Sequence, residues 1–149
     1  GGVEIALACD LLIASTDARF ADTHVKVGLL PGWGGSARLI RRVGLMRAKE
    51  LALTGRFLSA DEALAWGLVN RVVPPAQLLP EALALARQIA VHPAEAVMAC
   101  KQLLDREADV SLAEALRIER AASIAANSGV THGEIQARLD RLRRQGAPK

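Results

Sequence analysis

The chain has 149 residues, which is enough for one domain with its own hydrophobic core. Hydrophobic residues make up 51% of the chain and aromatic residues only 3%, while 19 Lys and Arg against 16 Asp and Glu leave a net charge of +3. A protein with so few aromatic side chains and so small a charge, concentrated in residues 138–149, is not expected to bind nucleic acid.

The amino-terminal part alternates short apolar runs with turns. Residues 5–9 predict a short helix entered from a pair of glycines, and residues 11–14 predict a buried strand. After a turn, residues 18–21 predict a second strand. Four glycines within residues 28–35, the glycine-rich loop, predict a backbone that reaches positive φ or approaches another group closely.

After this loop the pattern is mainly helical. Helical spacing, capping boxes and stops at glycine or proline predict helices over residues 36–43, 45–53, 59–67 and 76–91, and three more beginning at Pro93, Ser111 and Thr131. One further strand is predicted over residues 68–73, ended by two prolines. About three strands cannot make a complete sheet, so we expect an α/β protein with more chain upstream.

Cysteines and histidines do not indicate a structural metal or disulfides. Cys9 and Cys100 are too few for a disulfide framework, and the three histidines show no metal-ligand spacing with them. No apolar run reaches the ~18 residues of a membrane span, and no signal peptide is recognisable. We therefore expect a soluble cytoplasmic protein without a metal.

Glu4 is the first candidate catalytic residue. It follows two glycines and precedes an apolar helix, so its carboxylate is expected beside the N–H groups of a helix start, which favour negative charge. The local sequence fits equally well an ordinary glutamate at the start of a helix.

Three blocks of sequence occur in a characteristic order. They are Gly-Gly-Val-Glu-Ile-Ala-Leu-Ala-Cys-Asp at residues 1–10, Gly-Leu-Leu-Pro-Gly-Trp-Gly-Gly-Ser-Ala-Arg-Leu at 28–39, and Leu-Thr-Gly followed by Ala-Trp-Gly-Leu-Val-Asn within 53–70. With these blocks the chain resembles the crotonase (enoyl-CoA hydratase/isomerase) superfamily. The resemblance implies a truncated crotonase (ClpP-like) α/β fold. Residues 1–75 would be part of its core, and residues 76–149 a helical region that completes the pocket and mediates oligomerisation.

The resemblance also implies roles for individual residues. Members of this family bind acyl-CoA thioesters and hold the thioester oxygen in an oxyanion hole of two backbone N–H groups. Gly1 stands where one of these donors is expected, and the other is expected upstream of the chain. Family hydratases move protons with two glutamates, and Glu4 and His24 stand at those two positions.

His24 is the main departure from the hydratase pattern. A histidine can transfer a proton at neutral pH, but it is neutral or cationic where a glutamate is anionic, so the charge around the reacting water is expected to change. Three interpretations stay open: a catalytic acid or base, a residue that shapes the acyl pocket, or a structural residue in a shifted alignment. In the last case Asp22 would supply the carboxylate.

The glycine-rich loop lacks the Gly-Lys-Ser/Thr ending of a P-loop, so a phosphate-binding role is not favoured. The resemblance places the loop beside the acyl pocket. The expected pocket residues are Asp22, Leu30, Pro31, Gly32 and Trp33. Trp33 would serve equally as a buried packing residue.

The function that this resemblance favours is that of an enoyl-CoA hydratase, which adds water reversibly to a 2-enoyl-CoA thioester. CoA would enter as part of the substrate, with no separate cofactor, and the protein would be a homo-oligomer, a trimer or a dimer of trimers. Arg138 and Arg141 are candidates for contacts with CoA phosphates, or simply belong to a solvated helix end. The alternatives are an isomerase, decarboxylase or hydrolase with His24 in place of the second glutamate, and an inactive fragment or non-catalytic subunit.

Overall fold

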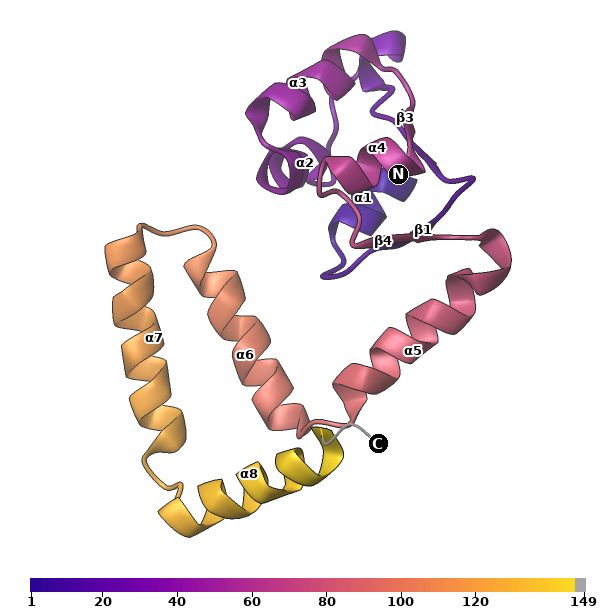
Figure 1. Ribbon diagram of the computed structural model, residues 1–149. Helices are drawn as coiled ribbons and strands as arrows, with labels where there is room; N and C mark the ends of the chain where they lie inside the picture. Colours follow the sequence, from indigo (N-terminus) through magenta and orange to yellow (C-terminus); the bar gives the residue numbers. More distant parts are fainter. Residues whose placement is uncertain (147–149) are drawn as a thin grey trace. The chain divides into compact units, whose positions relative to one another are not determined.

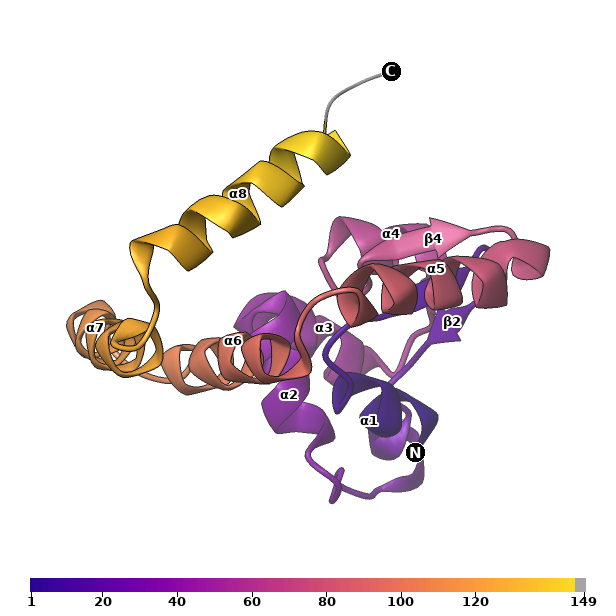
Figure 2. The ribbon, with the colours of Figure 1, turned by 90° about the horizontal axis from the view of Figure 1, so that it is seen from below.

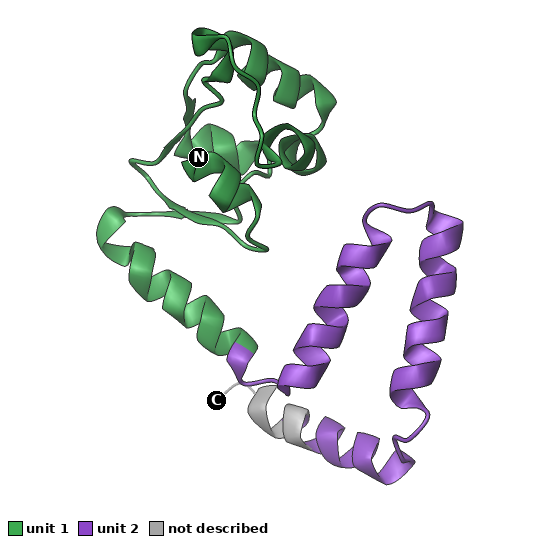
Figure 3. Ribbon diagram, turned by 180° about the vertical axis from the view of Figure 1, so that it is seen from behind, with its two compact units in different colours: residues 1–89 green, residues 90–149 purple. Residues whose placement is uncertain are grey.

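The computed structural model describes the backbone of residues 1–146, with the side chains of residues 1–140 and of Arg143. The chain divides into two compact units, residues 1–89 and 90–149 (Figure 3). Helix α5 (Leu78–Ala90) belongs to the first unit as far as Ile89, whereas the family resemblance implied a boundary after residue 75.

Helices dominate both units (Figure 1). The remaining elements are α1 (Gly2–Leu7), β1 (Ile13–Ser15), β2 (Arg19–Phe20), the 3₁₀ helix η1 (His24–Val27), α2 (Gly35–Val43), α3 (Leu45–Thr54), β3 (Leu58–Ser59), α4 (Ala60–Ala65), β4 (Arg71–Val73), the 3₁₀ helix η2 (Pro75–Gln77), α6 (Ala94–Glu107), α7 (Leu112–Asn127) and α8 (His132–Gly146). All predicted helices are confirmed, and so are the three predicted strands, although each is shorter than expected. The sequence did not predict β3, because two residues are too few to show a strand pattern.

The strands of the first unit form two separate ladders. β1 pairs with β4 in parallel, with Ala14 opposite Val72, and the Asn70 side-chain oxygen accepts a hydrogen bond from Leu12 N at 2.8 Å beside this ladder. β2 pairs with β3 in antiparallel fashion, with Phe20 opposite Leu58. Because β2 leads directly into residues 21–24, this second ladder anchors the segment that carries Asp22 and His24.

Among the residues that the structure describes, the hydrophobic core lies in the first unit. Its buried members come from α1 to α4, from β1 and β3, and from the turn before β4: Leu7, Ala14, Leu39, Val43, Ala48, Leu51, Leu58, Ala60, Ala63, Leu68 and Val69. α1 packs against α2, and α2 against α3, as the view from below shows for the first pair (Figure 2). This packing fixes α1, which carries Glu4, against the start of α2.

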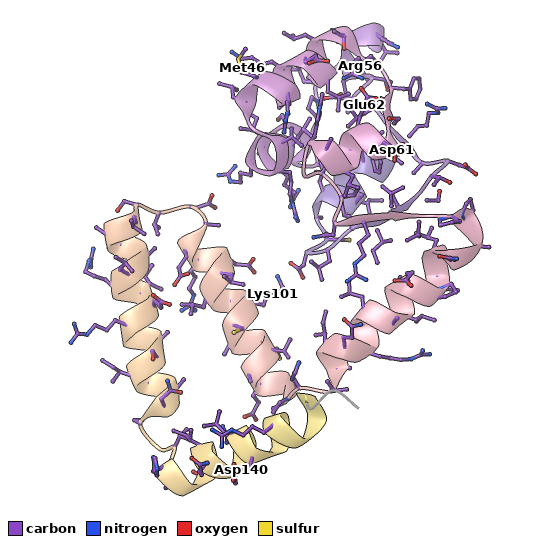
Figure 4. All side chains as sticks on the ribbon, viewed as in Figure 1. Met46, Arg56, Asp61, Glu62, Lys101 and Asp140 are labelled. Atoms are coloured by element: carbon purple, nitrogen blue, oxygen red, sulfur yellow. The ribbon has the colours of Figure 1, made fainter. Side chains whose placement is uncertain are left out.

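The start of α4 is held by a capping box, as predicted. The Ser59 hydroxyl accepts a hydrogen bond from Glu62 N at 3.2 Å, and the Glu62 carboxylate accepts one from Ser59 N at 2.9 Å. Arg56 binds the same carboxylate at 2.9 Å (Figure 4). Its guanidinium group also lies over the ring of Trp66, 5.2 Å from the ring centre. A second capping box, between Thr131 and Glu134, opens α8.

In the second unit α6 and α7 pack side by side as an antiparallel pair (Figure 1). Neither helix has a buried residue, and both carry exposed apolar side chains, among them Met98, Leu104, Leu116 and Ile124. Within the part of the chain that the structure describes, no helix is both long and apolar enough to cross a membrane.

Candidate active site

Glu4 is the one charged residue of the described chain that is buried, at 7% exposure. It lies in the first turn of α1, and its Oε1 accepts hydrogen bonds from two backbone N–H groups, Trp33 N at 3.1 Å and Gly35 N at 3.2 Å. Such bonds to a carboxylate are charge-assisted and stronger than neutral ones. Glu4 is therefore not an ordinary solvated glutamate at a helix start. One of its oxygens is fixed by a loop about 30 residues away.

The glycine-rich loop takes the conformation that its glycines allow. Gly28 and Gly34 have φ of 69° and 87°, in the left-handed region, as the sequence predicted. Gly35 fulfils a different requirement, because a Cβ at this position would lie 2.9 Å from both Cγ and Oε1 of Glu4. The absence of a side chain at Gly35 lets the start of α2 approach Glu4 closely enough to donate its N–H.

Arg38 holds the other side of the same loop. Its Nη1 donates a hydrogen bond to the Trp33 carbonyl oxygen at 2.7 Å, while Trp33 N donates to Glu4. One peptide segment is thus bound through both its N–H and its C=O. Nothing in the sequence pattern indicated this role for Arg38.

His24 has a carboxylate partner of its own. Its Nδ1 lies 2.7 Å from Asp22 Oδ1, and its backbone N–H donates to the same oxygen at 3.2 Å. The His24 side chain is 29% exposed and that of Asp22 12%. This pairing was not predicted from the sequence. An Asp-x-His spacing at the end of a strand was the available signal, since aspartate often binds the backbone two residues further on.

A single cavity of about 60 Å³ brings the predicted acid/base residues together. It is lined by Gly1, Val3, Glu4, Leu7, Ala21, Asp22, Thr23, His24, Pro31, Gly35 and Leu39. The lining combines two groups that can exchange protons, Glu4 and His24, with apolar side chains from α1 and α2. The Gly1 nitrogen lies 4.0 Å from Glu4 Oε2, so the predicted oxyanion residue is adjacent to the carboxylate.

The other predicted pocket residues have different surroundings. Pro31 and Asp22 line the cavity, whereas Leu30, Gly32 and Trp33 are exposed and lie outside its lining. Trp33 is 71% exposed, so its interpretation as a buried packing residue is wrong.

The candidate CoA residues are in the second unit. Arg138 is exposed on α8, and the side chain of Arg141 lies outside the described residues. Among the described residues no three His, Cys, Asp or Glu side chains gather as metal ligands.

The chain is similar to proteins of known sequence and structure. A family model described as enoyl-CoA hydratase/isomerase matches residues 1–132. The chain belongs to this family. A "Probable enoyl-CoA hydratase" of Rhizobium meliloti is 48% identical over 120 residues, which are 80% of this chain and 47% of that protein.

Solved structures of the family confirm the crotonase fold. The enoyl-CoA hydratase subunit I of Geobacillus kaustophilus matches with a TM-score of 0.86 and 34% identity, over 100% of this chain and 57% of that one. A Thermobifida fusca protein solved in complex with CoA matches with a TM-score of 0.81 and 38% identity, over 85% of this chain and 49% of that one. The chain thus spans about half the length of the relatives it matches.

Proposed function

We propose that the full-length protein is an acyl-CoA-processing lyase that adds water to a 2-enoyl-CoA thioester. The observation that carries the proposal is the position of Glu4 and His24 on one small cavity. A cavity of about 60 Å³ with polar groups in its lining is large enough to hold water. Two proton-transferring groups around bound water are what the addition of water to a polarised double bond requires.

The proposed proton transfers follow from the hydrogen bonds of the site. Glu4 Oε1 is engaged by Trp33 N and Gly35 N, so Oε2 is the oxygen that accepts a proton from water as the water oxygen bonds to C3. His24, in its protonated form, gives a proton to C2. Glu4 is then protonated and His24 neutral, and one proton returned through solvent restores both groups.

Polarisation of the thioester is the remaining requirement. We assign one oxyanion donor to Gly1, and its support is the position of this residue beside Glu4. A backbone donor aimed at a developing oxyanion is commonly worth about 3 kcal/mol of transition-state stabilisation. CoA is part of the substrate in this proposal, and no separate cofactor or metal takes part.

The proposal is tested with the full-length protein encoded by the gene, by following the loss of ultraviolet absorbance as crotonyl-CoA and longer enoyl-CoA thioesters are hydrated. Glu4→Gln is expected to lower kcat by about 10² to 10⁴ with the fold retained. Glu119→Gln, the same change at an exposed position on α7, is the matched control and should leave kcat unchanged. Full activity of Glu4→Gln would show that the role given to Glu4 is wrong.

A second candidate is hydrolysis of the thioester, and the Asp22–His24 pair favours it because a histidine backed by a carboxylate is a common base for activating water. Here the product would be free CoA and a carboxylic acid. A thiol reagent in the same assay detects the free CoA. Release of thiol without hydration would favour this candidate, and hydration without thiol release would exclude it. A family isomerase would instead consume a 3-enoyl-CoA.

We further propose a homo-oligomer, a trimer or dimer of trimers, in the cytoplasm. The exposed apolar side chains of α6 and α7 support association, and two exposed free thiols, Cys9 and Cys100, fit a reducing compartment. Light scattering during size-exclusion chromatography measures the mass of the assembly. A monomer at micromolar concentration would contradict the proposed oligomer.

A further inference from the structure

We propose that Asp22 and His24 act as one acid/base unit, in which the Asp22 carboxylate fixes the His24 ring and supplies the negative charge that a single glutamate would carry. This inference rests on the proposed function for its catalytic meaning. Its structural part depends only on the contacts of residues 22–24.

The hydrogen bond defines the tautomer of the ring. A carboxylate can only accept hydrogen bonds, so Nδ1 of His24, 2.7 Å from Asp22 Oδ1, carries a proton. In the neutral ring the lone pair is then on Nε2. Nε2 is consequently the atom that takes and returns a proton, as in other sites where a carboxylate orients a histidine.

The charges of the pair match those of a glutamate. Asp22 carries −1, so the pair has a charge of −1 when His24 is neutral and 0 when His24 is protonated. A single glutamate passes through the same two values. The sequence led us to expect a changed charge around the reacting water. The Asp22 contact corrects that expectation, because the negative charge is kept on the Asp22 carboxylate, which binds the Nδ1 side of the His24 ring.

A purely structural role for Asp22 is the competing explanation. The same Oδ1 accepts the backbone N–H of His24, the first residue of the 3₁₀ helix η1, at 3.2 Å and so closes a local turn. Asparagine makes this backbone contact equally well, but it has no charge. Asp22→Asn therefore separates the two roles, since it preserves the turn and removes the charge.

The first measurement is the tautomer itself. Nitrogen-15 NMR of histidine-labelled protein, at a pH where the rings are neutral, distinguishes a proton on Nδ1 from one on Nε2. The signals of His24 are assigned by their loss in His24→Gln, and the exposed His92 and His132 serve as internal references. We expect the Nδ1–H form in the wild type and a shift toward Nε2–H in Asp22→Asn.

The second measurement is a cycle of variants in the full-length enzyme. Asp22→Asn is expected to lower kcat by about 10-fold or more, with little change in KM, since the loss is one of transition-state stabilisation. His24→Glu places two carboxylates together, and adding Asp22→Asn to it restores a charge of −1. The same Asp22→Asn change should therefore raise kcat by about 10-fold in the His24→Glu background.

The reversal of sign distinguishes the two explanations. A structural Asp22 would give effects in the same direction in both backgrounds, and that result, or an unchanged tautomer in Asp22→Asn, would overturn the proposal. If the wild type hydrates no enoyl-CoA but Asp22→Asn still changes the tautomer, the proposed function fails while the Asp22–His24 unit stands. If hydration is normal and the tautomer does not respond, the unit fails while the function stands.

Discussion

Gly35→Ala is the substitution whose effect the structure predicts most directly. Gly35 is the first residue of α2, and its φ is not in the left-handed region, so its backbone accepts alanine without strain. Alanine should even favour the helix, by up to about 1 kcal/mol. The obstacle is the new Cβ, which would lie 2.9 Å from Cγ and Oε1 of Glu4 and 3.2 Å from its Cδ.

The size of the effect follows from these contacts. Glu4 is buried and held by Trp33 N and Gly35 N, so its side chain must move and at least one of these bonds must lengthen. Overpacking of this kind costs about 1–3 kcal/mol, which the gain in helix propensity partly offsets, so stability should fall by no more than about 3 kcal/mol. Displacing a catalytic group by about 1 Å can cost about 100-fold in rate, so kcat should fall by about 100-fold while the protein still folds.

The assay compares thermal unfolding and kcat for hydration of enoyl-CoA in the wild type and in the variant. Gly133→Ala is the matched control, because Gly133 is the second residue of α8 and no atom lies within 4 Å of the added Cβ. This control should keep full kcat and be equally or slightly more stable. If Gly35→Ala also keeps full kcat, the close approach of α2 does not position Glu4, and the reasoning is refuted.

Three further substitutions test the glycine-rich loop, the hydrophobic core and the cap of α4. Arg38→Met removes the 2.7 Å hydrogen bond to the Trp33 carbonyl oxygen. Because Trp33 N also donates a hydrogen bond to Glu4, kcat should fall by about 10-fold while the circular dichroism spectrum stays unchanged. Leu51→Ala opens a cavity at a fully buried position of the core and should lower the free energy of unfolding by about 2–5 kcal/mol in a denaturant titration. Ser59→Ala should cost about 1 kcal/mol at neutral pH. The Ser59 N–H and hydroxyl, together with a nearby arginine, hold the pKa of Glu62 below its ordinary value. The stability linked to Glu62 is therefore present above the ordinary pKa of a glutamate and is lost as the pH falls through the lowered value. The Ser59 variant should show a flatter acid limb of Tm against pH, and an unchanged limb would refute this linkage.

The sequence predicted the helices well because the signals that define them are local. The capping box at Ser59 and Glu62 spans four residues and is present in the structure as expected. Strand β3 was missed because Leu58 and Ser59 are too short a run to show a strand pattern, and their pairing with β2 joins segments far apart in the sequence.

The candidate site was predicted in its members but not in its contacts. The family resemblance implied that Glu4 and His24 are acid/base residues, and both line the same cavity. That Glu4 is held by Trp33 N and Gly35 N depends on packing between α1 and α2, over 29 and 31 residues of sequence, which no spacing rule reports. The pairing of His24 with Asp22 is local, but it depends on which rotamers the two side chains adopt.

The contacts that hold the two acid/base groups therefore differ in how they would be lost on partial unfolding. His24 is tied to Asp22 within a single turn, so this contact survives as long as that turn does. Glu4 loses its donors as soon as the glycine-rich loop detaches, even if every helix stays folded. In mild denaturant the hydrogen bonds to Glu4 should thus be lost first. Activity should then disappear before either the helix content or the tautomer of His24 changes.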